Sequence, residues 1–143
     1  MLKHNLLVVL AAAVFFAGCG ASGPRTAPVS GTVSYKGKPV AGASVSFVPE
    51  DPTGRIATGV TDSDGHFKLG TLSADDGAIA GKYRVTVIAR GPDRPAKPGE
   101  GSGMPGETVP GEPLIPAKYF SPDTSGLVQE VKPGKNTVAL KLD

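Results

Sequence analysis

The sequence predicts an all-β protein, a seven-stranded antiparallel β-sandwich with one long loop rich in Gly and Pro. Gly (20) and Pro (14) together make up 34 of the 143 residues, and both destabilise helix interiors. The hydrophobic residues, 39% of the chain, fall in short runs that alternate with polar residues, as half-buried strands require. Turn residues separate these runs at intervals of about 8 to 12 residues, a spacing typical of a two-sheet sandwich.

Four strands are expected in the first half of the folded region. Residues 29–35 alternate Val and Tyr with Ser and Thr, and residues 43–47 repeat this kind of pattern. Residues 56–60 form the third strand. A tight Asp-Ser-Asp-Gly turn at 62–65 leads into residues 66–69, so we expect the third and fourth strands to pair as a hairpin.

The second half supplies three more strands and no convincing helix. Residues 82–90 have the strongest alternation, with Tyr83 on the same face as three apolar residues. We therefore expect the Tyr83 ring in the core and its hydroxyl bonded to nearby backbone. Residues 127–132 and 136–142 complete a sandwich that extends over 29–143, and a Pro-Gly-Lys turn joins them.

A long connection interrupts the strands of the second half. Thirteen of the 28 residues from 91 to 118 are Gly or Pro. Loops longer than about 12 to 15 residues are usually functional or disordered, and the low apolar content predicts that 91–113 is a disordered loop. Beyond it, we expect four large side chains to attach the chain to the sandwich again: Leu114, Ile115, Tyr119 and Phe120.

Residues 1–18 have the features of an export signal, with Lys3 before an uncharged, mostly apolar run too short to span a bilayer. The run ends in Phe-Ala-Gly directly before Cys19, the only cysteine of the chain. This arrangement resembles the lipobox of bacterial lipoproteins. The resemblance implies a signal peptide over 1–18, a lipid with palmitate on Cys19, and a flexible tether over 19–28. An ordinary secreted protein cleaved near Ala21 is the alternative.

A lipid anchor would place the protein in the bacterial cell envelope, attached to a membrane. An Asp after the lipidated cysteine is associated with inner-membrane retention in some bacteria, and Gly20 stands here instead, which favours the outer membrane. Without Lys3 the chain has 14 basic side chains (15 minus 1) against 13 acidic ones. This near-neutral balance, without a basic patch, argues against a nucleic-acid partner.

Four segments resemble a carboxypeptidase regulatory-like domain, a family with a transthyretin-like sandwich. They are Val-Ser-Gly-Thr-Val at 29–33, Gly-Lys-Pro-Val-Ala-Gly-Ala at 37–43, Thr-Asp-Ser-Asp-Gly-His-Phe at 61–67 and Gly-Lys-Tyr-Arg-Val at 81–85. The region 115–127 resembles the closing segment of small bacterial lipoproteins built on this domain. The resemblance implies the sandwich fold and a non-catalytic module of the kind that accompanies peptidases and outer-membrane receptors.

Few residues suggest chemistry. Asp62 and Asp64, with two further Asp at 75–76, offer oxygen ligands for Ca²⁺, but the EF-hand spacing and its terminal Glu are missing. Asp and Gly also dominate tight turns for local reasons, so a turn is the favoured interpretation and an ion site the alternative. His66 is the only histidine after residue 18 and is expected in solvent, which argues against a multi-histidine zinc site and a catalytic triad. We therefore expect no catalytic residue, no cofactor and no enzyme activity.

The leading hypothesis is a lipid-anchored, non-enzymatic β-sandwich of the envelope with a structural or binding role. Its partners would be proteins or glycans that reach its loops or its exposed strand edges. One alternative is a solute-binding lipoprotein that uses 91–113 as a lid. Another is an accessory module of an envelope peptidase or receptor, which rests on the family resemblance alone.

Overall fold

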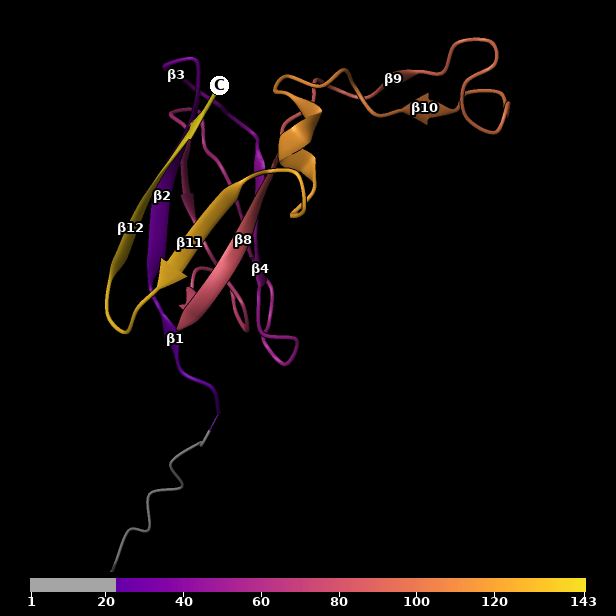
Figure 1. Cartoon of the computed structure of the whole chain (residues 1–143). Helices are drawn as coiled ribbons and strands as arrows, with labels where there is room; N and C mark the ends of the chain where they lie inside the picture. Colours follow the sequence, from indigo (N-terminus) through magenta and orange to yellow (C-terminus); the bar gives the residue numbers. More distant parts are fainter. Residues whose placement is uncertain (1–22) are drawn as a thin grey trace, which may run out of the picture.

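The computed structural model describes residues 23–143, and this region is all-β, as the sequence predicts (Figure 1). Its longer strands are β2 (Val29–Tyr35), β4 (Ser44–Pro49), β5 (Ala57–Val60), β6 (His66–Lys68), β8 (Gly81–Ile88), β11 (Leu127–Val131) and β12 (Asn136–Leu142). Five two-residue strands are β1 (Thr26–Ala27), β3 (Lys38–Pro39), β7 (Ala78–Ile79), β9 (Arg94–Pro95) and β10 (Thr108–Val109). The described residues therefore contain twelve strands where seven were expected, because pairings of two residues produce no visible alternation.

Two sheets form the body of the protein. One has the strand order β11-β8-β4-β5, and the other has β12-β2-β3, with β6 pairing a different stretch of the β2 edge that β3 occupies. Alternate residues of β2 and β12 are buried, and in β8 the alternating Tyr83, Val85 and Val87 are buried together with Thr86. Each sheet therefore turns one face toward the interior. The result is a β-sandwich whose strands run between two ends of the molecule (Figure 1).

The antiparallel prediction is wrong for one pair, because β12 runs parallel to β2 along all seven of its residues. The turn after β11 carries the chain from one sheet to the other instead of closing a hairpin. The Asn136 side chain stabilises this crossing: its Oδ1 accepts the N–H of Lys132 (2.9 Å), and its Nδ2 donates to the carbonyl oxygens of Lys132 (2.8 Å) and Gly134 (2.9 Å). Side-chain alternation reports burial and not strand direction, so the sequence did not reveal this pairing.

The hairpin expected between residues 56–60 and 66–69 is also wrong. β5 pairs with β4, whereas β6 pairs with β2 in the other sheet. The two segments meet at the turn, where the N–H of Asp62 donates to the carbonyl of His66 (2.8 Å), and at one isolated bridge between Thr58 and Gly70. The tight turn therefore connects the two sheets at an edge of the sandwich.

Three aromatic rings form the centre of the core. The Phe47 ring lies 6.5 Å from that of Phe67 and 5.8 Å from that of Tyr83, centroid to centroid. Tyr83 is 2% exposed, and its hydroxyl donates a 2.6 Å hydrogen bond to the carbonyl of Ile79. The expectation for Tyr83 is confirmed, and burial raises the pKa of its phenol.

The segment 91–113 forms an ordered arm in the structure, where the sequence predicts disorder. β9 and β10 pair as an antiparallel hairpin. The Arg94 guanidinium bonds both carboxylate oxygens of Glu100 (2.8 and 3.0 Å) and one of Glu112 (3.4 Å). At the tip, the Glu107 carboxylate accepts three successive backbone N–H groups. Polar pairs hold the arm, so its order has no signature in the hydrophobic pattern.

The chain returns to the sandwich through a 3-10 helix, η1 (Ala117–Phe120), which the sequence did not predict. Ile115 and Tyr119 are buried and Phe120 is partly buried, as expected, whereas Leu114 remains 52% exposed. No helix in the described region 23–143 is long and apolar enough to cross a membrane.

The N-terminal chain and the arm leave the sandwich at opposite ends (Figure 1). We call the end at which residues 23–25 enter the proximal end, and the end that carries the arm and η1 the distal end. The expected tether 19–28 is ordered from Thr26 onward, because β1 pairs with β7. The predicted signal peptide 1–18 and lipid site Cys19 lie outside the described residues.

Candidate functional site

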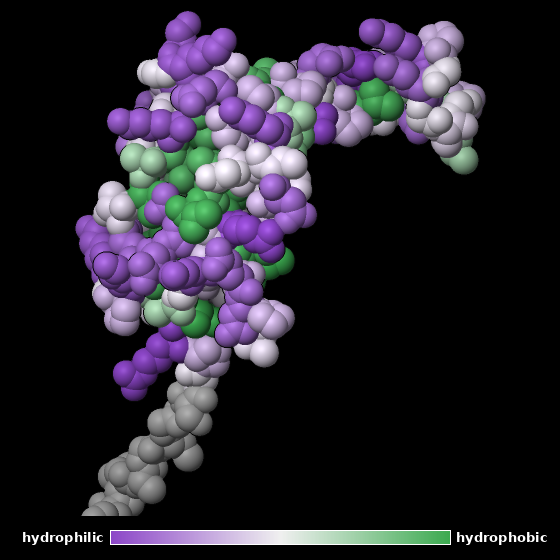
Figure 2. Space-filling view, viewed as in Figure 1, coloured by the Kyte–Doolittle hydropathy of each residue, from purple (hydrophilic) through white to green (hydrophobic). Residues whose placement is uncertain are grey.

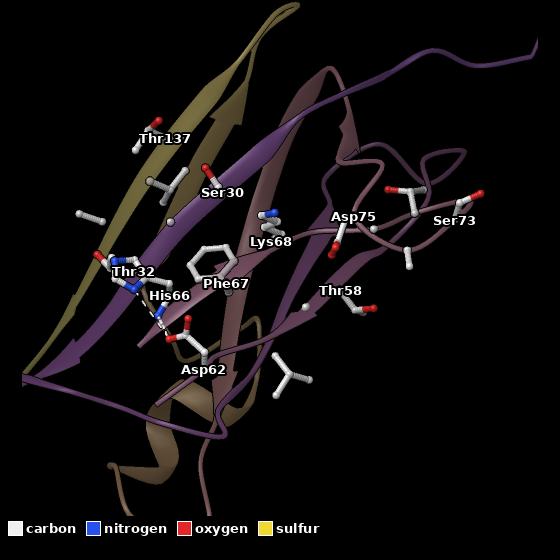
Figure 3. A pocket seen from close by; sticks show the side chains of 18 of the residues that line it. Ser30, Thr32, Thr58, Asp62, His66, Phe67, Lys68, Ser73, Asp75 and Thr137 are labelled. Atoms are coloured by element: carbon white, nitrogen blue, oxygen red, sulfur yellow. Dashed lines mark hydrogen bonds and ion pairs between the residues drawn. The ribbon is translucent and has the colours of Figure 1, made fainter. Parts of the chain in front are cut away.

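An open groove of about 1090 Å³ crosses the outer face of the sandwich (Figure 3). Outward-facing residues of β12, β2, β6 and β5 line it, and loop 70–75 forms a wall. Six hydroxyl side chains contribute to the lining: Ser30, Thr32, Thr58, Thr71, Ser73 and Thr137. The groove therefore presents many small hydrogen-bonding groups over a wide surface.

Strand alternation explains these hydroxyls. In β2 the buried residues Val29 and Val33 flank Ser30 and Thr32, which turn to the opposite face of the strand. In β12, Thr137 is exposed for the same reason. The small polar residues whose alternation with apolar residues predicts these strands therefore also form the groove surface.

The groove floor depends on a glycine. A Cβ atom on Gly31 would collide with the carbonyl oxygen of Val138 and lie 2.8 Å from the Phe67 ring. Gly31 therefore allows β12 and Phe67 to approach β2 closely. Phe67 is only 3% exposed, so it supports the groove from below and offers little ring surface to a ligand.

One edge of the groove is an open strand edge. β12 is the last strand of its sheet, and within the described residues it pairs with β2 alone. The N–H of Asn136 donates to the carbonyl of Pro28, on the β2 side. Because alternate residues of a parallel strand bond one neighbour, Thr137, Ala139 and Lys141 direct their N–H and C=O groups to the open edge.

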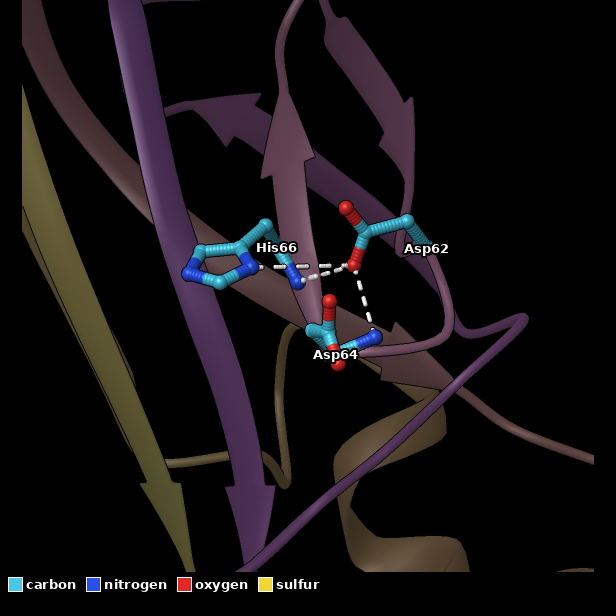
Figure 4. Close-up of side chains that lie close together, drawn as sticks. All are labelled: Asp62, Asp64 and His66. Atoms are coloured by element: carbon cyan, nitrogen blue, oxygen red, sulfur yellow. Dashed lines mark hydrogen bonds and ion pairs between the residues drawn. The ribbon is translucent and has the colours of Figure 1, made fainter.

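Asp62 and His66 lie at the groove rim, and Asp64 is beside them (Figure 4). Asp62 Oδ1 accepts the backbone N–H groups of Asp64 and His66, each at 2.9 Å, and lies 3.7 Å from His66 Nδ1. The His66 N–H is the main reason that the pKa of Asp62 lies below its usual range. The structure thus shows the side-chain and backbone contacts of a tight turn.

These three side chains are also a geometric candidate for a metal site. One donor atom from each falls within 4.8 Å of the others, and all three residues are exposed. The Asp62 oxygen nearest the imidazole already accepts two N–H groups, and the turn accounts for the cluster without an ion. Asp75 lines the far side of the groove and Asp76 caps its own loop, so the structure does not bring this pair to Asp62.

His66 is exposed, as predicted, and its side chain contacts Asp62 alone among the ion pairs and hydrogen bonds of the described residues. A histidine that acts as a general base needs a nucleophile within hydrogen-bond reach. The arrangement at the rim offers hydrogen-bonding groups from Asp62, Asp64 and His66.

The arm does not cover the groove. All groove-lining residues lie in 30–32, 58–75 and 137–139, and none belongs to 91–113. The arm extends away from the body at the distal end (Figure 1). This geometry removes the support for a lid.

Figure 2 shows a second surface that could be considered as a binding site, an apolar patch on the face of the body that carries β11. Apolar colour gathers over β11 in the middle of the body, where Val128 is 57% exposed, whereas the arm is mostly hydrophilic. Single apolar side chains of this kind are normal on protein surfaces.

The sequence analysis did not predict the groove, because the groove is lined by strands that are distant in the chain. The Ser and Thr residues that alternate with apolar residues in these strands were the one feature of the sequence that pointed to it.

No protein-family model and no curated protein matches the chain. One solved structure that the chain matches weakly is the dioxygenase domain of a "novel dioxygenase carbohydrate-binding protein fusion" from the cellulolytic bacterium Streptomyces sp. SirexAA-E. Its sequence is 22% identical, the match covers 87% of this chain and 83% of that one, and the TM-score is 0.38. At this TM-score the likeness carries no functional argument.

Proposed function

We propose that this protein is a lipid-anchored, non-enzymatic β-sandwich of the bacterial envelope, built on a carboxypeptidase regulatory-like domain, that binds an extended segment of a partner protein. The lipobox-like sequence before Cys19 supports the anchor. The observation that carries the binding role is the groove, which runs beside the open edge of β12.

A protein segment fits this groove because the two sources of hydrogen bonds lie side by side. The free edge of β12 offers backbone N–H and C=O groups to an added strand, the arrangement used in β-strand addition. The hydroxyls of Ser30 and Thr32 lie on the neighbouring strand β2, one strand in from that edge. Exposed Val60 adds an apolar side chain on the opposite side of the groove, from β5.

A glycan partner is less well supported. Aromatic rings usually supply broad apolar faces for ligand contact at binding sites. The one aromatic residue in the groove lining is Phe67, which is buried. The groove is therefore better suited to polar backbone than to the apolar face of a sugar ring.

Position-specific photo-crosslinking tests the proposal. A photoreactive amino acid at Thr137, inside the groove, should capture a discrete envelope protein, and the same group at Val128, on the other sheet, should not. The substitution Ala139→Arg fills the groove from an exposed position and should abolish capture, whereas the matched change Val128→Arg should leave it intact. Equal capture at both positions, or a captured glycan, would contradict the proposal.

A separate measurement tests the anchor. Palmitate incorporation and sedimentation with membranes should both be lost in Cys19→Ser, because this residue carries the only thiol. Lipid incorporation that survives this substitution would reject Cys19 as the attachment site, and no incorporation in the wild type would reject the lipid anchor; neither result bears on the groove.

A further inference from the structure

The proximal end of the sandwich lies close to the proposed lipid site. Four residue-to-residue steps separate Cys19 from Gly23, the first residue that the structure describes. In any conformation these steps span at most about 14 Å. The headgroup region of a bilayer is about 5 to 8 Å deep on each side. A lipid on Cys19 therefore requires the proximal end to remain within roughly the depth of one or two headgroup layers.

Contacts around the chain entry identify which loops make up this end. Pro24 lines a small pocket of about 270 Å³ together with residues 51–55 and 79–83. The next residues pair with β7, so the end of loop 70–77 is adjacent. The chain thus enters the domain between loop 50–56 and loop 70–77, and these loops would face the membrane.

Each of these loops exposes one large apolar side chain. Ile56 is 54% exposed and Leu72 is 50% exposed. Exposure of an apolar side chain of this size to water is unfavourable, and next to a membrane such a side chain can enter the boundary between headgroups and acyl chains. Ile56 lies outside the groove lining, so the groove does not explain its exposure.

Internal hydrogen bonds keep both loops in their exposed form. Asp51 Oδ1 accepts the N–H (2.8 Å) and the hydroxyl (2.7 Å) of Thr53 in the first loop. Asp76 accepts the N–H groups of Thr71 (2.7 Å), Leu72 (3.1 Å) and Ser73 (3.0 Å) in the second. Loops braced in this way hold their apolar side chains in place.

The charges at the proximal end are nearly balanced. The basic residues there are Arg25, Arg55, Lys68, Lys82, Lys132 and Lys135, and the acidic ones are Glu50, Asp51, Asp75, Asp76 and Glu130. Such a surface is neither drawn to nor repelled by an anionic membrane, so the contact would depend on the apolar side chains.

From this geometry we infer that the proximal end is a membrane-contact surface, in which Ile56 and Leu72 enter the headgroup region of the bilayer that holds the lipid on Cys19. The inference rests on the lipid anchor of the proposed function. It also orients the protein: the distal end and the arm point away from that membrane (Figure 1). The short connection to the lipid, the two apolar side chains and the near-neutral charge all favour contact of this end with the membrane.

Site-specific fluorescence tests this surface in the full-length lipidated protein, reconstituted in phosphatidylcholine vesicles. Since the natural thiol is acylated, Ile56→Cys, Leu72→Cys and Val128→Cys each provide a single site for an environment-sensitive fluorophore. Val128 is the matched control, 57% exposed but on the outer face of β11. Nitroxide-labelled lipids should quench the probes at 56 and 72 by at least about half and leave the probe at 128 nearly unchanged.

A water-soluble quencher should give the reverse order, with the probe at 128 quenched most. Equal lipid quenching at the three positions, or none at 56, would overturn the membrane-contact surface. Mass analysis of the N-terminal peptide from the same sample shows whether Cys19 carries lipid. If Cys19 is unmodified, the proposed lipid anchor is wrong. If the protein is lipidated but the probe at 56 is not quenched, only the proposed orientation at the membrane is wrong.

Discussion

Thr61 offers a sharp test of how the start of the Asp62 turn is stabilised. Its side chain is 4% exposed, and its hydroxyl makes two buried hydrogen bonds. Oγ1 accepts the N–H of Ala43 at 2.8 Å and donates to the carbonyl of Val40 at 2.6 Å. The substitution Thr61→Val keeps the shape of the side chain and removes only the hydroxyl, so it leaves both backbone groups without this partner.

The expected loss of stability follows from those two groups. A buried polar group without a partner costs about 1 to 3 kcal/mol, so two cost roughly 2 to 6 kcal/mol. The added methyl returns about 0.8 kcal/mol through burial of apolar surface. We expect the free energy of unfolding to fall by roughly 1 to 5 kcal/mol, a large part of the 5 to 15 kcal/mol typical of a domain. The melting temperature should fall by roughly 10 °C.

Urea unfolding followed by far-ultraviolet circular dichroism measures this loss. Thr61→Ser is the control, because it keeps the hydroxyl and removes one buried methyl, at a cost of about 1 kcal/mol. If Thr61→Val unfolds within about 0.5 kcal/mol of the wild type, or if the Ser variant is the less stable of the two, the hydroxyl does not have the role assigned to it.

Three further outcomes follow from the structure. Gly31→Ala should destabilise the fold by about 1 to 3 kcal/mol through the collision in the groove floor, whereas Gly23→Ala, with open space around it, should be neutral in thermal unfolding. The pKa of Glu100 is lowered to about 2, first by the hydrogen bond from the Arg94 side chain and then by the N–H of Lys97. The ionised carboxylate therefore stabilises the arm fully at pH values above 4.5, the ordinary pKa of the group in the unfolded chain. That support should be lost as pH falls from 4.5 toward 2, and a Lys97 amide shift that titrates near 4.5 by nuclear magnetic resonance would contradict it. Asp62→Ala should speed amide exchange in the 62–66 turn while Asp62→Asn, which keeps an acceptor, should not, and equal exchange in both would show that Oδ1 does not brace the turn.

Local pattern was enough to locate most strands. Residues 29–35 and 136–142 were expected as strands and form β2 and β12 with the same bounds, because each buries alternate residues against the other sheet. Tyr83 was expected in the core from its place in such an alternation. The exposure of His66 and the tight turn at Asp62 also followed from local turn chemistry.

The pairing of the strands required tertiary information. The segments 56–60 and 66–69 look like a hairpin in the sequence, yet each joins a different sheet, because burial is satisfied equally well by either partner. The arm shows a second limit of the pattern. Arg94 and Glu100 bond across a Gly- and Pro-rich segment, and a single ion pair between partly buried side chains leaves no periodic trace.

The sequence by itself determined an all-β chain, the buried faces of β2, β4, β8 and β12, and a lipobox-like segment before Cys19 that remains a prediction. These features are local, since they depend on residues a few positions apart and on the alternation of side chains in a strand. Only the tertiary structure decided that β12 lies parallel to β2, that a groove forms beside its free edge, and that the arm and the N-terminal chain lie at opposite ends. Those features depend on which distant segments pack together. Gly31 is the clearest case. A side chain at this position would collide with the carbonyl oxygen of Val138, a residue more than a hundred positions away in the sequence.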